Sequence, residues 1–377
     1  MDVILGFGPL HDGLIAAALR GAGAEARACR APDDEALAAG RARMARGHPS
    51  ATHYLAGAAI LHRRAHPAEA LRFVTPGDRC GGYATDLARA LADDGAPRAT
   101  VLALAPERAS SVWDDLGVEP ARATPALLDA VAAGDLLDAA CRRLAASGRG
   151  DETTALRVRA VAAELERALE TGAPVEDVLR ARRGVLRAPH GATAPRARVR
   201  VTGELLPTRY DHDVGGGLVR WLCARGVAVE APTLCEWALY AAWRSEVARG
   251  ATTPWRDEIL RALHRMAEAL GVTPPRPVDP WAWAAEAARW LPVSLCAGSG
   301  FMELATYLAA ERDQSADLVL SLKPFASITS SAVSDAVLHA LSRERATAFL
   351  SLELNGDLAA QLESRLELAL NAARSAP

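Results

Sequence analysis

Short apolar segments alternate with helix-forming segments in two separate parts of the chain. In the first part, the apolar runs DVILGFG, LRFVTPG and ATVLALAP are separated by helical patterns such as HDGLIAAALRGAG and GYATDLARALADDG. The second part repeats the alternation with ARVRVTG, VAVEAPTL, the buried-strand pattern of residues 318–322, and TAFLSLELNG. Strands separated by helices of this length form βαβ units with a parallel sheet. We therefore predict an α/β fold with two flavodoxin-like parallel-sheet domains joined by a helical segment.

The stretch between the two blocks sets the predicted domain boundaries. Residues 107–194 contain long amphipathic helical patterns and run into the Pro/Ala/Gly-rich segment APHGATAPRAR (188–198). We predict an N-terminal α/β domain over 1–106, a helical connector over 107–194 and a C-terminal α/β domain over 195–377. Open parallel sheets bind ligands beyond the carboxyl ends of their strands, so we expect a ligand cleft between the domains.

Charge and hydropathy exclude several classes of partner. The chain has 43 basic and 46 acidic side chains and a formal net charge of -3, so we expect no nucleic-acid partner. No apolar run approaches the roughly 20 residues that span a bilayer, and the N-terminus lacks the pattern of a secretion signal. We therefore expect a cytoplasmic protein without a membrane partner. The six cysteines include no CxxC pair, which argues against a zinc site.

The segment ADLVLSLKPFASITSSAVSDAVLHAL (316–341) is the best candidate binding loop. Hydroxyl side chains, among them Ser327, Ser330 and Ser331, lie between a buried strand and a helix, and they follow Lys323, the only lysine of the chain. Hydroxyl groups and free backbone N–H groups at a helix start attract anions, and a lysine strengthens such a site for a phosphate or carboxylate. Two simpler explanations stay open, namely capping of the helix by the hydroxyls and chance retention of the lysine.

Two other segments carry residues capable of acid–base chemistry. Glu204 and Arg209 belong to the strand-to-helix loop GELLPTRYDHDVGGG, which fits either acid–base work or an ordinary solvated loop. His48 and His53 are five residues apart around a proline, whereas a metal pair on one helix face needs a spacing of four.

These loops together resemble the 2-hydroxyacyl-CoA dehydratase and benzoyl-CoA reductase subunit family, including the branch associated with its ATP-dependent activator. The C-terminal pattern of that family, K-P-F-G-C-M-P-S-S, is similar to residues 323–331, and residues 202–240 are similar to the opening of its second domain. The resemblance implies a CoA-related function and a [4Fe–4S] cluster held by three cysteines.

All three cysteine positions of the family carry other residues in this chain. The resemblance places Pro49, Asp78 and Ser327 there, with Cys80 two residues beyond the second position. Iron–sulfur clusters require thiolate ligands, which a hydroxyl does not replace. The resemblance thus implies a protein without a cofactor. A [4Fe–4S] cluster held by unusual ligands is the alternative.

Three functions follow from this resemblance. The first is a non-catalytic subunit or assembly partner of a cluster-bearing homologous subunit or of the ASKHA-type activator. The second is an enzyme or binding protein that holds an acyl-CoA or another anionic substrate in the cleft. Its polar contacts would come from Lys323, Ser327, Ser330, Ser331, Arg79, Glu204 and His48. The third is a redox enzyme with unusual cluster ligands.

Overall fold

The computed structural model divides into two compact units, and it describes most of the chain. The described residues are 1–77, 82–96, 99–104, 109–149, 152–186, 194–210, 216–250, 254–296, 298–325, 327–354 and 359–375. Unit 1 consists of Met1–Asp138, Ala155–Arg187 and Ser245–Arg276, and unit 2 consists of Ala139–Thr154, Ala188–Arg244 and Pro277–Pro377.

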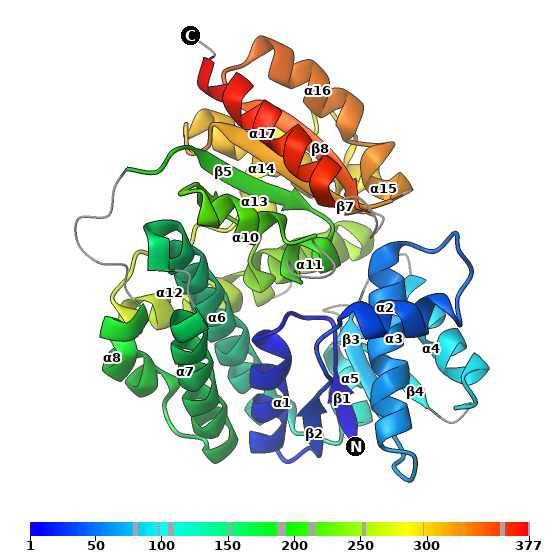
Figure 1. Cartoon of the computed structure of the whole chain (residues 1–377). Helices are drawn as coiled ribbons and strands as arrows, with labels where there is room; N and C mark the ends of the chain where they lie inside the picture. Colours follow the sequence, from blue (N-terminus) through cyan, green and yellow to red (C-terminus); the bar gives the residue numbers. More distant parts are fainter. Residues whose placement is uncertain are drawn as a thin grey trace. The chain divides into compact units, whose positions relative to one another are not determined.

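Unit 1 contains a four-stranded, all-parallel sheet with the strand order β2-β1-β3-β4. Its strands are β1 (Asp2–Ile4), β2 (Ala26–Ala28), β3 (Arg72–Pro76) and β4 (Thr100–Leu104). The helices of the N-terminal α/β region are α1 (His11–Gly21), α2 (Asp34–Arg41), α3 (Ser50–Ala65), α4 (Gly82–Asp93) and α5 (Ala109–Leu116). Four further helices follow: α6 (Pro120–Leu144), whose last turns belong to unit 2, α7 (Glu152–Thr171), whose first residues belong to unit 2, α8 (Val175–Leu186) and α12 (Trp255–Leu270) (Figure 1).

Unit 2 repeats this topology with the strand order β6-β5-β7-β8, again all parallel. Its strands are β5 (Arg198–Gly203), β6 (Ala228–Glu230), β7 (Leu318–Pro324) and β8 (Ala348–Leu354). Its helical segments are η2 (Ala145–Arg149), α9 (Leu205–Arg209), α10 (Leu218–Ala224), α11 (Leu234–Arg249, which ends in unit 1), α13 (Pro280–Ala287), η3 (Val293–Leu295), α14 (Gly300–Arg312), α15 (Ile328–Ser331), α16 (Asp335–Glu344) and α17 (Ala359–Ser375). The predicted fold class, two parallel α/β sheets of flavodoxin-like order, is confirmed.

Helices cover both faces of the unit 2 sheet, as its continuous apolar strands require. Helices α10 and α17 pack on one face over a core that includes Leu318, Leu320 and Leu322. Helices α14 and α16 pack on the other face over a second core that includes Val319 and Phe349. Because successive side chains of a strand point to opposite faces, Ser321 and Lys323 share the face of Val319 and point toward α14 and α16.

A glycine with positive φ lies at the carboxyl end of the first strand of each sheet. At this place the order of the strands in the sheet reverses direction. Gly6 follows β1 with a φ of 101°, and a Cβ atom there would lie 2.9 Å from Pro76 Cδ of β3. Gly203 ends β5 with a φ of 121°, and a Cβ atom there would lie 1.9 Å from the Leu322 carbonyl oxygen of β7. Only glycine fits this conformation and this close approach. These two places are the topological switch points, where open parallel sheets bind ligands.

The helices of the predicted connector belong to the compact units themselves. Most of the segment 107–194 packs within unit 1, where α8 contacts α12, a helix that comes from the second half of the chain. Arg183 of α8 donates to the carbonyl oxygens of Ala269 and Glu268 at the end of α12, at 2.7 and 3.0 Å. The units therefore divide differently from the predicted boundaries at 106/107 and 194/195. Composition could not reveal that α12 and α8 pack together, because their contact is distant in sequence.

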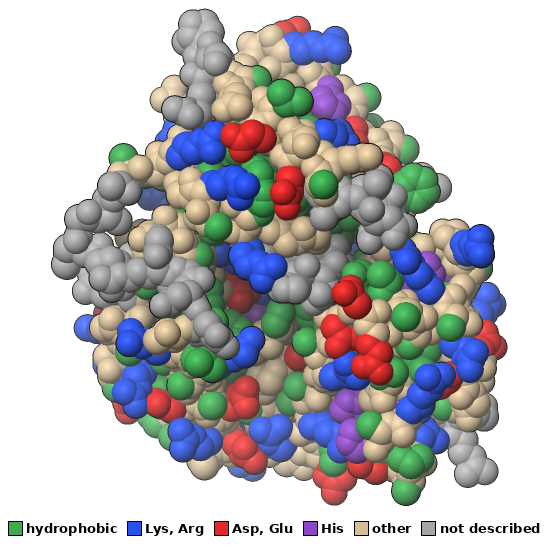
Figure 2. All heavy atoms as spheres, in the orientation of Figure 1, with side chains coloured by type: hydrophobic (Ala, Val, Ile, Leu, Met, Phe, Trp, Pro, Cys, Tyr) green, Lys and Arg blue, Asp and Glu red, His purple; other side chains and the backbone are tan. Residues whose placement is uncertain are grey.

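Charged side chains of both signs are interspersed on the face that Figure 2 shows, in keeping with the near balance of 43 basic and 46 acidic side chains. Within the described ranges, no helix is both long enough and apolar enough to cross a bilayer.

Candidate functional site

A buried polar network lies on the α14 and α16 face of the unit 2 sheet, around the fully buried carboxylate of Glu303. Glu303 is in the first turn of α14. Four hydroxyl groups and one ammonium group donate to its carboxylate: Ser299 Oγ at 2.9 Å, Ser321 Oγ at 2.8 Å, Ser334 Oγ at 3.3 Å, Ser330 Oγ, and Lys323 Nζ at 3.2 Å. A buried carboxylate needs such donors, because an unpaired charge in the interior is strongly unfavourable.

Lys323 is the only basic side chain in this network, and it is fully buried. Its ammonium group contacts Glu303 and also Asp335 Oδ1 at 2.5 Å. Asp335 lies in the first turn of α16 and accepts a further hydrogen bond from Ser351 Oγ of β8 at 3.0 Å. The two carboxylates neutralise the lysine within the unit. An external anion would have to displace them before it could contact this ammonium group.

Glu204 places a second carboxyl group at the β5/β7 switch point, and it is only partly buried. The backbone N–H of Glu204 donates to the Leu322 carbonyl oxygen at 2.9 Å, which fixes the residue directly after the close approach of Gly203. The Glu204 carboxyl group accepts a hydrogen bond from Ser327 Oγ at 2.8 Å, and its Oε1 atom lies 3.1 Å from Ser299 Oγ. The predicted loop residue Ser327 thus meets the predicted acid–base residue Glu204.

Ser299 links the two carboxyl groups, since its Oγ lies within hydrogen-bond distance of both Glu204 and Glu303. A hydroxyl group has one proton to donate, so both contacts are favourable only when one of the two carboxyl groups is protonated. Burial raises the pKa of Glu204 above its usual range; hydrogen bonds from Ser327 and Ser299 oppose this rise in pKa, and the negative charge of Glu303 adds to it. The arrangement therefore favours a proton on Glu204.

The predicted site residues fall into three groups. Lys323, Ser327, Ser330 and Glu204 meet in the network, and Ser331 lies beside it, where its Oγ donates to Glu353 at 2.8 Å. His48 and Pro49 lie in unit 1. Arg79 and Asp78, together with Cys80, are outside the described residues. Because no contact in the structure involves a bound molecule, the substrate-binding roles of these residues stay predictions.

His48 and Pro49 have local partners at the start of α3. The His48 Nδ1 atom lies 3.2 Å from Asp86 Oδ2, and the His48 and His53 rings are 6.3 Å apart in an edge-to-face arrangement. Pro49 is the N-cap residue of α3 and its carbonyl oxygen accepts from Thr52 N at 3.0 Å. Over the described ranges, no group of three or more His, Cys, Asp or Glu side chains has a metal-binding arrangement.

Sequence reasoning missed Glu303 and Asp335, which complete the network. A signal for them exists in the strand pattern. Ser321 and Lys323 alternate on one face of a buried strand, so a helix covering that face must supply polar partners. Glu303 is the single charged residue in the apolar run GFMELATYL, which makes that helix the candidate.

Unit 1 has a smaller buried polar cluster where α1 begins. His11 is fully buried, with Nε2 at 3.1 Å from Asp135 Oδ1 and Nδ1 at 3.8 Å from Asp138 Oδ2, both of α6. The neighbouring Asp12 accepts from Phe7 N at 2.9 Å. These contacts hold the start of α1 and the loop after β1 against α6. The geometry therefore gives His11 a structural role.

No family model matches the chain, and neither a curated protein nor a solved structure matches it at a significant level. The family resemblance therefore rests on the loop motifs alone and stays a prediction.

Proposed function

We propose that the chain is a cluster-less relative of the 2-hydroxyacyl-CoA dehydratase and benzoyl-CoA reductase subunits, and that it acts as a non-catalytic subunit or assembly partner. Its partner would be a cluster-bearing homologue or an ASKHA-type ATPase activator. The main support is the hydrogen bond from Ser327 Oγ to Glu204, because the family places a cluster cysteine at this position. Carboxyl groups of the unit itself hold the side chains of Ser327 and Ser330, which supports a loop that does not serve as a cluster ligand.

The exposed side chain of Phe325 supports a docking role for this loop. Phe325 directly follows β7 and is 59% exposed, while its backbone N–H donates to the Leu354 carbonyl oxygen at 3.0 Å. An aromatic side chain held on a fixed backbone is well suited to an interface, where aromatic residues are enriched.

Co-expression with candidate partners tests the proposal. The protein should co-purify with a cluster-bearing homologue or with the activator ATPase, and Phe325→Ala should weaken that complex about tenfold or more. Leu368→Ala is the matched control, since Leu368 is 72% exposed on α17, away from the loop, and its loss should leave the complex unchanged. A protein that stays alone beside every such partner would remove the proposal.

Iron content distinguishes this proposal from a redox enzyme with unusual cluster ligands. After anaerobic purification, the proposal predicts a colourless protein without iron. Stoichiometric iron and sulfide with visible absorbance would contradict it and favour the redox alternative.

A second candidate function is favoured by Glu204, a partly buried residue at the switch point where parallel sheets bind ligands. A protonated Glu204 can donate a hydrogen bond to a carbonyl oxygen, such as that of an acyl-CoA thioester. Binding should raise the melting temperature in a screen of CoA esters by mass action. Glu204→Gln keeps a donor and should retain the shift, whereas Glu204→Ala should lose it. A screen without any shift would exclude this function.

A further inference from the structure

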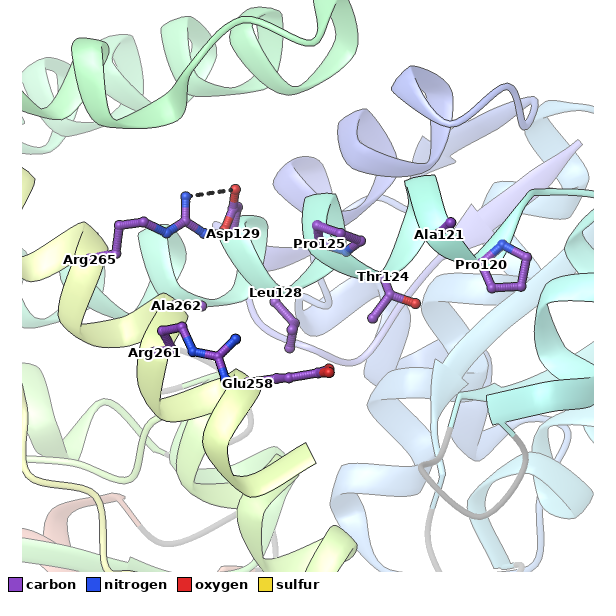
Figure 3. A pocket seen from close by; sticks show the side chains of 10 residues that line it. All are labelled: Pro120, Ala121, Thr124, Pro125, Leu128, Asp129, Glu258, Arg261, Ala262 and Arg265. Atoms are coloured by element: carbon purple, nitrogen blue, oxygen red, sulfur yellow. Dashed lines mark hydrogen bonds and ion pairs between the residues drawn. The ribbon is translucent and has the colours of Figure 1, made fainter. Parts of the chain in front are cut away.

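A pocket of about 460 Å³ lies in unit 1 between α6 and α12, far in sequence from the polar network of unit 2 (Figure 3). This volume is within the range of small-molecule sites. Its walls have an apolar part and a charged part. The apolar part includes Pro125 and Leu128 of α6 and Ala262 of α12, and the charged side chains are Asp129, Glu258, Arg261 and Arg265.

One pair of these charges is already used within the protein. Arg265 forms ion pairs with Asp129 of α6 and with Glu176 of α8. Figure 3 shows the Arg265 guanidinium directed at Asp129. This pairing joins three helices of unit 1. Arg265 and Asp129 therefore have a structural role that does not require a ligand.

The other pair, Glu258 and Arg261, has no such explanation. Both residues lie on α12, three positions apart, so their side chains leave the same face of the helix with Cβ atoms roughly 5–6 Å apart. Among the described residues, neither side chain forms a hydrogen bond or an ion pair, even with the other. Glu258 is partly buried and Arg261 is exposed, and Figure 3 shows both projecting from α12 toward Leu128 of α6.

The balance of charge restricts the ligand. Two acidic and two basic side chains line the pocket, so their formal charges cancel and neither a simple anion nor a simple cation is favoured. A ligand that carries an ammonium and a carboxylate on the same carbon atom satisfies both open groups, since its carboxylate can take a bidentate contact from Arg261 and its ammonium can pair with Glu258. The apolar wall then accommodates an apolar body attached to these charges.

We propose that this pocket is a binding site for a zwitterionic small molecule with an apolar side chain, of the α-amino acid class. Arg261 holds the carboxylate, Glu258 holds the ammonium group, and Pro125, Leu128 and Ala262 contact the side chain. The affinity is modest, because Arg261 is exposed and exposed charge pairs contribute little. The site is independent of the proposed subunit role, which concerns unit 2.

Calorimetric titration of the full chain with three matched probes tests the site. L-Phenylalanine carries both charges, 3-phenylpropionate lacks the ammonium group and 2-phenylethylamine lacks the carboxylate. We expect L-phenylalanine to bind with a dissociation constant on the order of 0.1–1 mM. Each analogue should bind about tenfold more weakly or worse, because it leaves one charged group without a partner.

Three variants locate the binding site. Arg261→Gln and Glu258→Gln should each weaken the binding of L-phenylalanine about tenfold, and neither should lower the melting temperature, because among the described residues these side chains have no hydrogen bond or ion pair to lose. Arg256→Gln is the control, since Arg256 is on the same helix and does not line the pocket. Absence of binding at 10-fold the expected dissociation constant, equal binding of either analogue, or binding unaffected by Arg261→Gln would each overturn the proposal.

Discussion

The Lys323 ammonium group is enclosed between Glu303 and Asp335, in a chain whose other basic side chains are arginine and histidine. A compact ammonium group on a flexible stem reaches two carboxylates from the end of a buried strand, whereas a planar guanidinium needs more room. The position therefore explains why a lysine persists there. This role belongs to the interior of the unit, and it differs from the anion contact that the loop sequence favours.

Removing this lysine should destabilise the protein severely. Lys323→Met leaves Glu303 and Asp335 without their cation, and we expect a loss of about 3–5 kcal/mol in the free energy of unfolding. Chemical denaturation followed by circular dichroism measures this loss. Adding Glu303→Gln to Lys323→Met should recover part of the stability. A single variant as stable as the wild type would show that the buried ion pair is unimportant.

Glu204 should give the stability a specific pH dependence. Its pKa in the folded protein is raised above the ordinary value of 4.5, mainly by burial, so the folded state binds this proton more tightly than the unfolded state. The contribution of Glu204 to stability therefore falls as the pH rises through the interval above 4.5. Glu204→Gln removes the ionisation, and we expect a higher melting temperature than the wild type at pH 8 and an equal one at pH 4. A pH-independent difference would contradict this assignment.

At the scale of elements, the two glycines at the switch points allow the first strand of each sheet to approach its neighbour. Gly203→Ala would place a methyl group on the Leu322 carbonyl oxygen at a positive φ, and we expect a loss of at least about 2 kcal/mol in the free energy of unfolding. Gly23→Ala is the control, because Gly23 has a φ of 105° but no atom within 4 Å of the added Cβ. Its loss should be smaller, about 1 kcal/mol. Equal losses would mean that φ alone matters.

The strands and their order could be predicted from the sequence more readily than the site. Apolar runs such as those of β4, β7 and β8 mark parallel strands by composition alone, and the hydroxyl-rich loop after β7 is evident in the same way. The partners of that loop could not be predicted, because Glu303 comes from a helix 20 residues before Lys323 and Glu204 lies 123 residues before Ser327. Local patterns do not specify which helix covers which face of a sheet.

At the scale of the whole molecule, neither compact unit is a continuous stretch of chain. Ala139–Thr154 belongs to unit 2, where Ala145 and Ala146 of η2 pack against the core beneath α10. A fragment of residues 195–377 lacks this segment, although it matches the predicted C-terminal domain. We expect it to unfold without a cooperative transition, or at a melting temperature well below that of the full chain. Thermal denaturation followed by circular dichroism measures both, and a fragment as stable as the full chain would restore the predicted boundary.

The enclosure of Lys323 also determines how the protein reacts with amine-directed reagents. The chain has one side-chain amine, and it is 0% exposed. An activated ester applied to the folded protein should therefore leave the Lys323 amine unmodified. A label on Lys323 would appear only when unit 2 opens, and mass analysis of the peptide that contains Lys323 would count these openings directly.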